Sequence, residues 1–195
     1  MLIEDGQGTG YTAGVNLENR LKTIAITSTI EHHINHEEGN AYSFITQQTP
    51  TESDPSGTTS GDICFAYLKN TNDIDISLEE IDIRLGGTSQ AEIIKILGKT
   101  TGNPIGGNTI TPANLNLGSG KEADGIFQAS NEITGLSGGT ELHRIYIGSS
   151  NTSETFNFGQ DIIVTKNNII TLWASNGNTE IDIVLLFNYH SVLAG

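Results

Sequence analysis

Short segments in which apolar and polar residues alternate at period two recur through this sequence, and they restrict its fold more than any other feature. The clearest covers residues 73–85, where Ile and Leu alternate with polar residues over 73–78 and again over 81–85. Successive side chains of a strand point to opposite faces, so the pattern predicts a half-buried strand. The phase slips by one residue at Glu79-Glu80. We expect a β-bulge there, because neither residue favours the positive φ of a tight hairpin turn.

The same reasoning predicts strands along the rest of the chain. Residues 91–97 are ambiguous, because Ser89-Gln90-Ala91-Glu92 has the form of a helix capping box, but their β-branched content favours a strand. The longest segment, 180–190, is apolar on both faces in its middle, which predicts a central position in a sheet. The other predicted strands are 22–28, 41–46, 62–69, 143–147, 161–165 and 168–174.

The fold class follows from what separates these segments. The chain of 195 residues has 23 Gly and no long helical pattern, and only 35% of its residues are hydrophobic. This composition predicts an all-β protein, an antiparallel two-sheet β-sandwich of jelly-roll kind. Residues 1–20 are expected to form an extended N-terminal arm, and residues 21–195 a single sandwich domain. Residues 99–120, rich in Gly, Asn, Thr and Pro, are expected to form a long ordered excursion.

Charge and cysteine content narrow the classes of partner. Nine Lys and Arg stand against 23 Asp and Glu, which gives a formal net charge of −14. Nucleic acid and an anionic membrane surface are therefore not expected as partners, because both attract clustered cations. Cys64 is the single cysteine, so no intrachain disulfide and no cysteine-based metal site are expected. The N-terminus lacks the pattern of a signal peptide, so we expect the chain to fold in a cytosol.

Two segments contain side chains that can bind metal ions. In the segment 32–38, His32 and His36 could share a zinc ion if they lay on a helix, but no third ligand is identifiable, and a solvated turn is expected. The densest acidic cluster alternates with Ile along predicted strands, which places it on the outward face of a sheet; it comprises Asp73, Asp75, Glu79, Glu80 and Asp82. The sequence therefore predicts no metal site.

Three segments have part of the spacing of a catalytic or cofactor-binding motif, but the residues around each of them do not fit that motif. Gly135-Leu136-Ser137-Gly138-Gly139 has nucleophile-elbow spacing, but a strand follows it rather than a helix, so a glycine-rich turn is expected. Gly118-Ser119-Gly120-Lys121 lacks the Ser or Thr that a phosphate loop needs after the lysine. Residues 6–10 are not a dinucleotide fingerprint, because no strand precedes them.

Three further side chains are expected to be structural. Cys64 lies in the middle of a predicted strand and is expected to be a buried, inert thiol. Trp173 and Tyr189 are expected in the core or at an interface. The chain is thus predicted to be non-enzymatic, with no catalytic residue and no cofactor.

Three segments carry a resemblance to a known family. They are Gly8 to Val15 leading into Asn19 to Thr23, Thr111 to Ser119, and Phe158 to Val164 followed by Asn167 to Trp173. These resemble small virion structural proteins of tailed bacteriophages. The resemblance implies a head decoration (cement) protein of β-sandwich fold, often trimeric, which binds the major capsid protein on the exterior of a capsid assembled in the host cytoplasm. The arm residues implied at the interface are Gly8, Thr9, Gly10, Tyr11, Asn19 and Arg20.

Two alternatives stay open at this point. A tail, fibre or receptor-binding component would recognise glycans and would favour aromatic residues in loops, yet residues 47–61 and 98–124 contain none. A carbohydrate-active enzyme would need two carboxylates about 5–10 Å apart in a cleft, which a sequence alone does not reveal.

Overall fold

A computed structural model describes residues 3–4, 12–13, 38–51, 62–86, 91–148, 152–176 and 178–189. The chain divides into two units, Met1–His33 and Ile34–Gly195. In the first unit, β1 (Ile3–Glu4) pairs antiparallel with β2 (Thr12–Ala13). The strand predicted at 22–28 and the domain boundary predicted at residue 20 lie outside the described residues.

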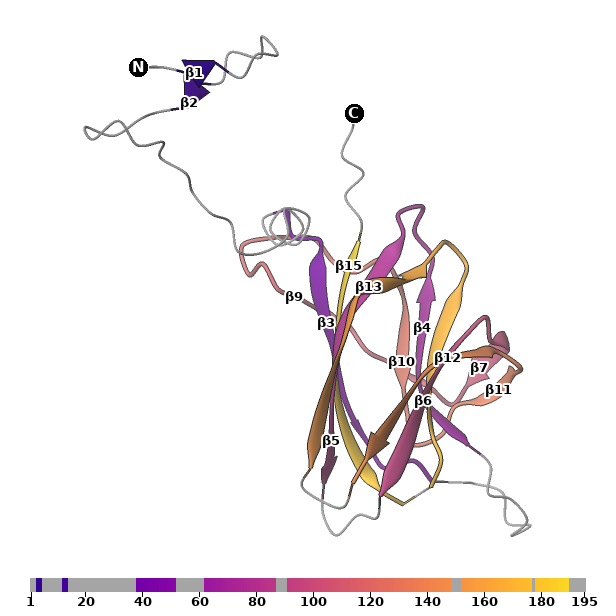
Figure 1. Cartoon of the computed structure of the whole chain (residues 1–195). Helices are drawn as coiled ribbons and strands as arrows, with labels where there is room; N and C mark the ends of the chain where they lie inside the picture. Colours follow the sequence, from indigo (N-terminus) through magenta and orange to yellow (C-terminus); the bar gives the residue numbers. More distant parts are fainter. Residues whose placement is uncertain are drawn as a thin grey trace. The chain divides into compact units, whose positions relative to one another are not determined.

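Two antiparallel sheets face each other in the second unit (Figure 1). Sheet I contains, in spatial order, β12 (Thr140–Ile147), β6 (Glu92–Gly98), β14 (Ile169–Ala174), β4 (Ile63–Asn70), β10 (Gly125–Ala129) and β8 (Asn108–Thr109). Sheet II contains β13 (Ser153–Val164), β5 (Ile76–Gly86), β15 (Glu180–Tyr189), β3 (Ala41–Gln48) and β9 (Ala113–Asn114). The two-sheet sandwich predicted from the sequence is confirmed.

The pairing of the long strands is that of a jelly roll. Within the described residues, β3 pairs with β15, β4 with β14, β5 with β13, and β6 with β12. These are the pairs that one long hairpin would make, with its closed end between β6 and β12. Alternate pairs lie in opposite sheets, so the hairpin is rolled into two layers, as in jelly rolls.

The excursion between β6 and β12 lies at the closed end of this hairpin and covers sheet edges. Its β10 and β8 extend sheet I beyond β4, and its β9 extends sheet II beyond β3. The first and last strands of the excursion, β7 (Thr101–Ile105) and β11 (Thr134–Ser137), pair as a separate ribbon. Ile133 and Leu136 of this region pack against Cys64, Tyr67 and Trp173 of sheet I. Residues 99–120 are thus ordered, as predicted.

The bulge predicted at Glu79-Glu80 is confirmed. On β15, Leu186 lies opposite Glu80 and Phe187 opposite Leu78, which leaves Glu79 as the extra residue. Because β5 is continuous through this bulge, the apolar side chains on both sides of it point into the core; they are Ile76, Leu78, Ile81, Ile83 and Leu85. The prediction was wrong at the start of this element, since the strand begins at Ile76 and residues 72–74 form a bend.

Other strand predictions have mixed outcomes. Residues 92–98 form a strand and not a helix, and β15 lies centrally between β5 and β3, as expected. The strand predicted at 161–165 is the end of β13, which starts at Ser153. Its first part was missed because most of its residues are exposed at a sheet edge, which removes the apolar alternation. The short strands β10 and β11 were also missed.

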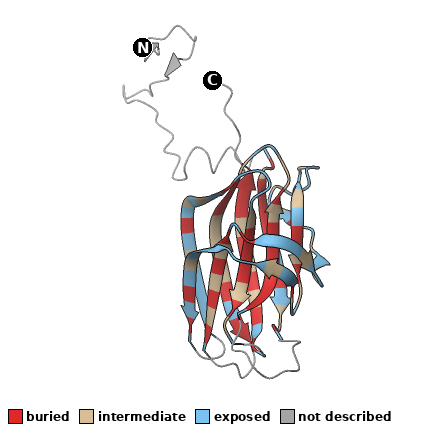
Figure 2. Ribbon diagram, turned by 90° about the vertical axis from the view of Figure 1, so that its right-hand side faces the viewer, coloured by how far each residue is buried: buried red, intermediate tan, exposed pale blue. Residues whose placement is uncertain are grey.

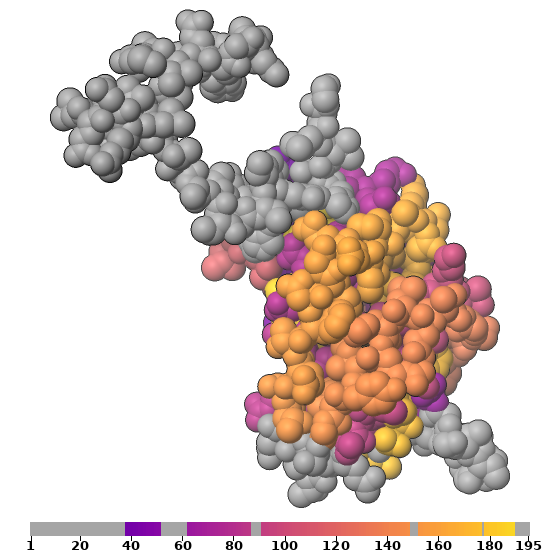
Figure 3. Space-filling model, in the orientation of Figure 1, coloured from indigo at the N-terminus to yellow at the C-terminus, as the bar shows by residue number. Residues whose placement is uncertain are grey.

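The core lies between the two sheets. In Figure 2 the buried residues, in red, run along the strands of the sandwich. An aromatic cluster joins the layers, because the ring of Phe187 lies 5.6 Å from Tyr42 of its own sheet and 5.3 Å from Phe127 of sheet I, between ring centroids. At one side of the sandwich the edge strands β12 and β13 also meet, where the rings of His143 and Phe156 lie 3.7 Å apart between centroids, tilted by 30°. These two strands form much of the face shown in orange in Figure 3.

Gly102 gives a test of the ribbon formed by β7 and β11. Its φ is +104°, and a Cβ placed there would lie 2.1 Å from the backbone oxygen of Gly135. We expect Gly102→Ala to lower the free energy of unfolding by about 1–3 kcal/mol, because the alanine is strained in φ and displaces the opposite strand. Thermal or chemical denaturation measures this loss. Gly120→Ala is the control, since a Cβ at Gly120 meets open space; equal losses in the two variants would contradict the expectation.

Candidate functional site

A loop at the end of β9 exposes the most accessible large apolar side chain in the described part of the chain. This leucine loop comprises residues 111–121 and includes β9. Leu117 at its tip is 97% exposed, and Leu115 is 36% exposed. Single exposed leucines are common on protein surfaces. What distinguishes Leu117 is that the loop around it is fixed by hydrogen bonds.

Asparagine side chains hold the leucine loop in shape. Asn114 Oδ1 accepts a hydrogen bond from the amide of Asn116 at 2.8 Å, and Asn116 Oδ1 accepts one from the amide of Gly118 at 3.0 Å. The amide of Ser119 donates to the carbonyl of Asn116 at 2.9 Å. These are Asx-type turns, in which a short polar side chain replaces a backbone partner. Leu117 is therefore presented by an ordered backbone.

The leucine loop is also fastened to the start of β3. Asn114 Nδ2 donates to the carbonyl of Gly39, and Lys121 Nζ donates to Asn40 Oδ1 at 2.9 Å. Gly39 has φ +70°, and a Cβ there would lie 2.2 Å from Ser119 Oγ. Only glycine fits this position without displacing the loop. The leucine loop is thus packed against residues 39–40, directly before the sandwich begins.

The arm residues predicted at an interface lie outside the described residues; they are Gly8, Thr9, Gly10, Tyr11, Asn19 and Arg20. The segment 32–38 also lies outside them, except for Glu38, which is exposed and accepts a hydrogen bond from Asn40. The leucine loop itself was part of the resemblance at Thr111 to Ser119, but its role was not predicted. The sequence does contain a signal for an exposed apolar loop, because Leu115 and Leu117 stand among Asn and Gly residues that cannot form a core.

The acidic residues of the predicted cluster interact with different partners rather than with one common ligand site. Asp73 pairs with Lys166 at 2.6 Å, and Asp82 accepts a hydrogen bond from Thr155. Glu79, at the bulge, accepts hydrogen bonds from the side chains of Gln160 and Asn188. Within the described ranges, no group of three or more His, Cys, Asp or Glu side chains is placed to hold a metal ion.

The glycine-rich segment 135–139 and the aromatic residues Tyr189 and Trp173 have structural roles. Ser137 ends β11, and Gly138 and Gly139 have φ +65° and +114° before β12 begins, which confirms the predicted glycine-rich turn. Tyr189 is a core residue whose hydroxyl donates to the carbonyl of Asp124. Trp173 packs beside Cys64 on the outer side of sheet I and donates from Nε1 to Thr171. In the part of the chain that is described, no helix is long and apolar enough to span a membrane.

Cys64 is predicted to be unreactive in the native protein. It is 1% exposed, and burial raises the pKa of its thiol to about 12. At pH 8 the thiolate fraction is then about one in 10⁴, whereas a free cysteine is substantially ionised. We expect a water-soluble aromatic disulfide to label native Cys64 at least about 1,000-fold more slowly than the guanidinium-unfolded chain. Labelling at comparable rates in the two states would contradict this burial.

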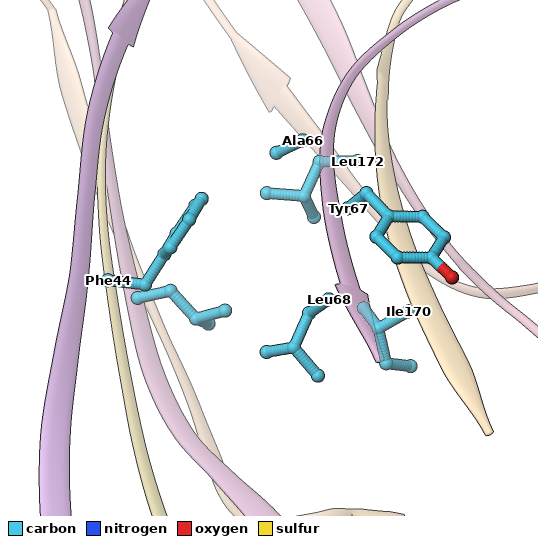
Figure 4. Close-up of a pocket in the computed structure, with 7 residues that line it drawn as sticks. Phe44, Ala66, Tyr67, Leu68, Ile170 and Leu172 are labelled. Atoms are coloured by element: carbon cyan, nitrogen blue, oxygen red, sulfur yellow. The ribbon is translucent and has the colours of Figure 1, made fainter. Parts of the chain in front are cut away.

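A small cavity lies between the sheets, and it is apolar (Figure 4). Phe44 and Leu185 of sheet II face Leu68, Ile170 and Leu172 of sheet I across it. It has room for about one water molecule and no polar lining, so it is a packing gap rather than a ligand site.

Comparisons with known proteins identify no family. No protein-family model matches the chain, and no curated protein matches it. Among solved structures, one similarity is to a D431N mutant of the VP2 protein of infectious bursal disease virus in derived T=1 particles. The identity is 15% and the TM-score 0.15, with 77% of this chain and 38% of the VP2 chain covered. VP2 is thus a particle-forming viral protein, but a TM-score this low carries no argument about this chain.

Proposed function

We propose that this chain is a non-enzymatic structural protein of a virion, and specifically a decoration protein bound to the exterior of a phage head. The observation that carries the proposal is Leu117, which is 97% exposed on a loop fixed by its own asparagines. A loop whose backbone is already fixed before binding loses little backbone conformational entropy on docking. Burial of this leucine in a pocket of the partner would contribute about 1.5–3 kcal/mol.

Three further observations support this proposal. The leucine loop coincides with the segment Thr111 to Ser119, one of those that resemble phage virion proteins. The jelly-roll pairing is a fold that viral capsid and lectin domains share, although a fold by itself does not decide function. The formal charge of −14 suits a component on the outside of a particle filled with DNA.

The proposed mechanism is additive burial of surface. The protein forms an oligomer, and the resemblance implies a trimer. Many such oligomers bind the major capsid protein and bridge neighbouring capsomers, which opposes the internal pressure of the genome. A contact of about 1,200–2,000 Å² would suffice for specificity. The N-terminal arm would add to it at an ordering cost of about 1–2 kcal/mol per residue. Deleting residues 1–14 tests this addition, and unchanged capsid binding would remove the arm from the mechanism.

Immunogold electron microscopy of purified particles tests the location. Label spread over the head supports decoration. Label confined to the tail contradicts it and favours the receptor-binding alternative. Absence of label from all particles contradicts a virion role altogether.

Leu117→Asp tests the leucine loop directly. We expect binding to heads stripped of this protein to weaken at least about tenfold, because a leucine burial worth about 1.5–3 kcal/mol is replaced by the burial of a charge. Sedimentation of the protein with stripped heads measures the affinity. Ile163→Asp is the matched control, since Ile163 is 45% exposed on β13, at the other edge of sheet II. Equal affinities of the two variants would show that the leucine loop is not the docking element.

A further inference from the structure

A second loop of the sandwich is built like the leucine loop. This isoleucine loop, residues 70–75, leads from the end of β4 to the start of β5, and its Ile74 is 40% exposed. Asn70 Oδ1 accepts a hydrogen bond from the amide of Asn72 at 2.9 Å, and Asn72 Oδ1 accepts one from the amide of Ile74 at 3.0 Å. These are two successive Asx turns, as in the leucine loop. Each loop therefore presents an aliphatic side chain on a backbone that asparagines hold in shape.

The first asparagine of each loop also fastens the loop to a neighbouring segment. Asn70 is fully buried, and its Nδ2 donates to the carbonyl of Val164 at the end of β13, at 2.8 Å. Asn114 Nδ2 donates to the carbonyl of Gly39, just before β3, at 2.8 Å. Both loops can therefore dock without the ordering cost that a flexible backbone would have.

The two loops lie at the same end of the sandwich (Figure 1). Asn70 lies opposite Gly125, the first residue of β10, and the preceding residue, Asp124, comes shortly after the leucine loop. Asp124 Oδ1 accepts a hydrogen bond from the hydroxyl of Thr71 in the isoleucine loop at 3.2 Å. The carbonyl of Asp124 accepts one from the hydroxyl of Tyr189, the last residue of β15, at 2.7 Å. Asp124 therefore links the isoleucine loop to the segment that follows the leucine loop, and both to sheet II.

The charged side chains around these two loops are mainly acidic. Within the described residues, the carboxylates in and beside the loops are Glu38, Asp73, Asp75, Glu122 and Asp124, and the cations there are Lys69, Lys121 and Lys166. Lys166 pairs with Asp73 at 2.6 Å, and Lys121 donates to Asn40 Oδ1, so two of the three cations are engaged within the chain. A partner with basic side chains around its binding site complements this end, whereas DNA and anionic lipid would be repelled.

We propose that Ile74 is a second anchor for the partner that Leu117 binds, and that this partner carries two apolar sites with basic side chains around them. The inference rests on the proposed function, because it takes the partner to be the protein shell of the phage head. Because Asp124 links the two loops, a protein surface that docks on one of them lies next to the other. Two anchors on one rigid body fix the orientation of the bound protein, which a single exposed leucine does not.

Sedimentation of the full-length protein with stripped heads tests the second anchor. We expect Ile74→Asp to weaken binding at least about fivefold, because an apolar contact is replaced by a buried charge. Ile105→Asp is the matched control, since Ile105 is 63% exposed on β7 in the separate ribbon, and it should change binding less than about twofold. Equal affinities of these two variants, with Leu117→Asp still weakened, would overturn the second anchor and leave the proposed function standing. A wild-type chain that does not bind heads would overturn both.

The double variant of Ile74→Asp and Leu117→Asp separates direct contact from an effect through the leucine loop. If Ile74 contacts the head itself, the two fold-losses multiply to within about twofold, as expected for separate contacts. If Ile74 only shapes the leucine loop through Asp124, Ile74→Asp adds nothing to Leu117→Asp, which would overturn the proposal. Ile74→Val keeps an aliphatic side chain and should bind like the wild type; a loss equal to that of Ile74→Asp would also overturn it.

Glu122→Lys tests the charge of the partner. Glu122 is exposed directly after the leucine loop, and reversing its charge should slow association with heads at least about threefold at low salt. The difference should shrink at high salt, which screens exposed charges. Glu154→Lys is the matched control, because Glu154 is exposed on β13 and the substitution changes the net charge by the same amount. Equal association rates of the two variants at low salt would overturn the basic surroundings proposed for the partner's sites.

Discussion

Replacing Phe187 with alanine should lower the free energy of unfolding by about 4 kcal/mol. Phe187 is fully buried, and its ring stacks on Tyr42 and Phe127 and meets Tyr189 edge-on at 6.1 Å. The substitution removes burial of a large side chain, leaves a cavity and breaks aromatic pairs that join the two sheets. The loss is a large fraction of the stability of an ordinary domain. Denaturant titration followed by the tryptophan fluorescence of Trp173 measures it.

The control for Phe187 is Ile45→Ala. Ile45 lies on the neighbouring strand β3, but its side chain points outward and is 58% exposed. Its truncation should change the free energy of unfolding by less than about 0.5 kcal/mol. A loss below about 1 kcal/mol for Phe187→Ala would mean that the aromatic cluster does not join the layers as described.

Glu92→Ala should be nearly as costly, at about 3 kcal/mol. Glu92 is 1% exposed, and its Oε1 accepts hydrogen bonds from the amides of Ile93, Ser175 and Asn176 and from the hydroxyl of Ser175, at 2.7–3.0 Å. Alanine removes the acceptor of the Asn176 amide and leaves the amides of Ile93 and Ser175 with one acceptor each, Ser175 Oγ and the Ile93 carbonyl. An unpaired donor costs about 1–3 kcal/mol unless water reaches it. Chemical denaturation again gives the measurement.

Two other glutamate variants test this explanation. Glu92→Gln keeps one side-chain oxygen as an acceptor and should recover at least half of the loss. Glu141→Ala removes an exposed carboxylate paired with Arg144, and it should cost less than about 1 kcal/mol. If the alanine variants at 92 and 141 were equally stable, Glu92 would not organise the turn after β14.

The role of Glu92 also illustrates a limit of local sequence patterns. Ser89-Gln90-Ala91-Glu92 has the spacing of a capping box, but the carboxylate caps a turn 83 residues away in the chain. The pattern contains the right kind of group, an acceptor for orphan amides. Which amides it serves depends on β6 and β14 being neighbours in sheet I, and this pairing is not encoded in the spacing of four residues.

Local sequence patterns predict most of the long strands, the bulge at Glu79 and the central position of β15, but not the short strands β10 and β11. Each of these depends on the alternation of side chains between two faces, a local property that is visible along the chain. Tertiary structure alone decided the jelly-roll pairing, the partners of Glu92 and the presentation of Leu117. These features depend on which strands become neighbours, and that choice is made by the burial of whole faces across the sandwich rather than by any single segment.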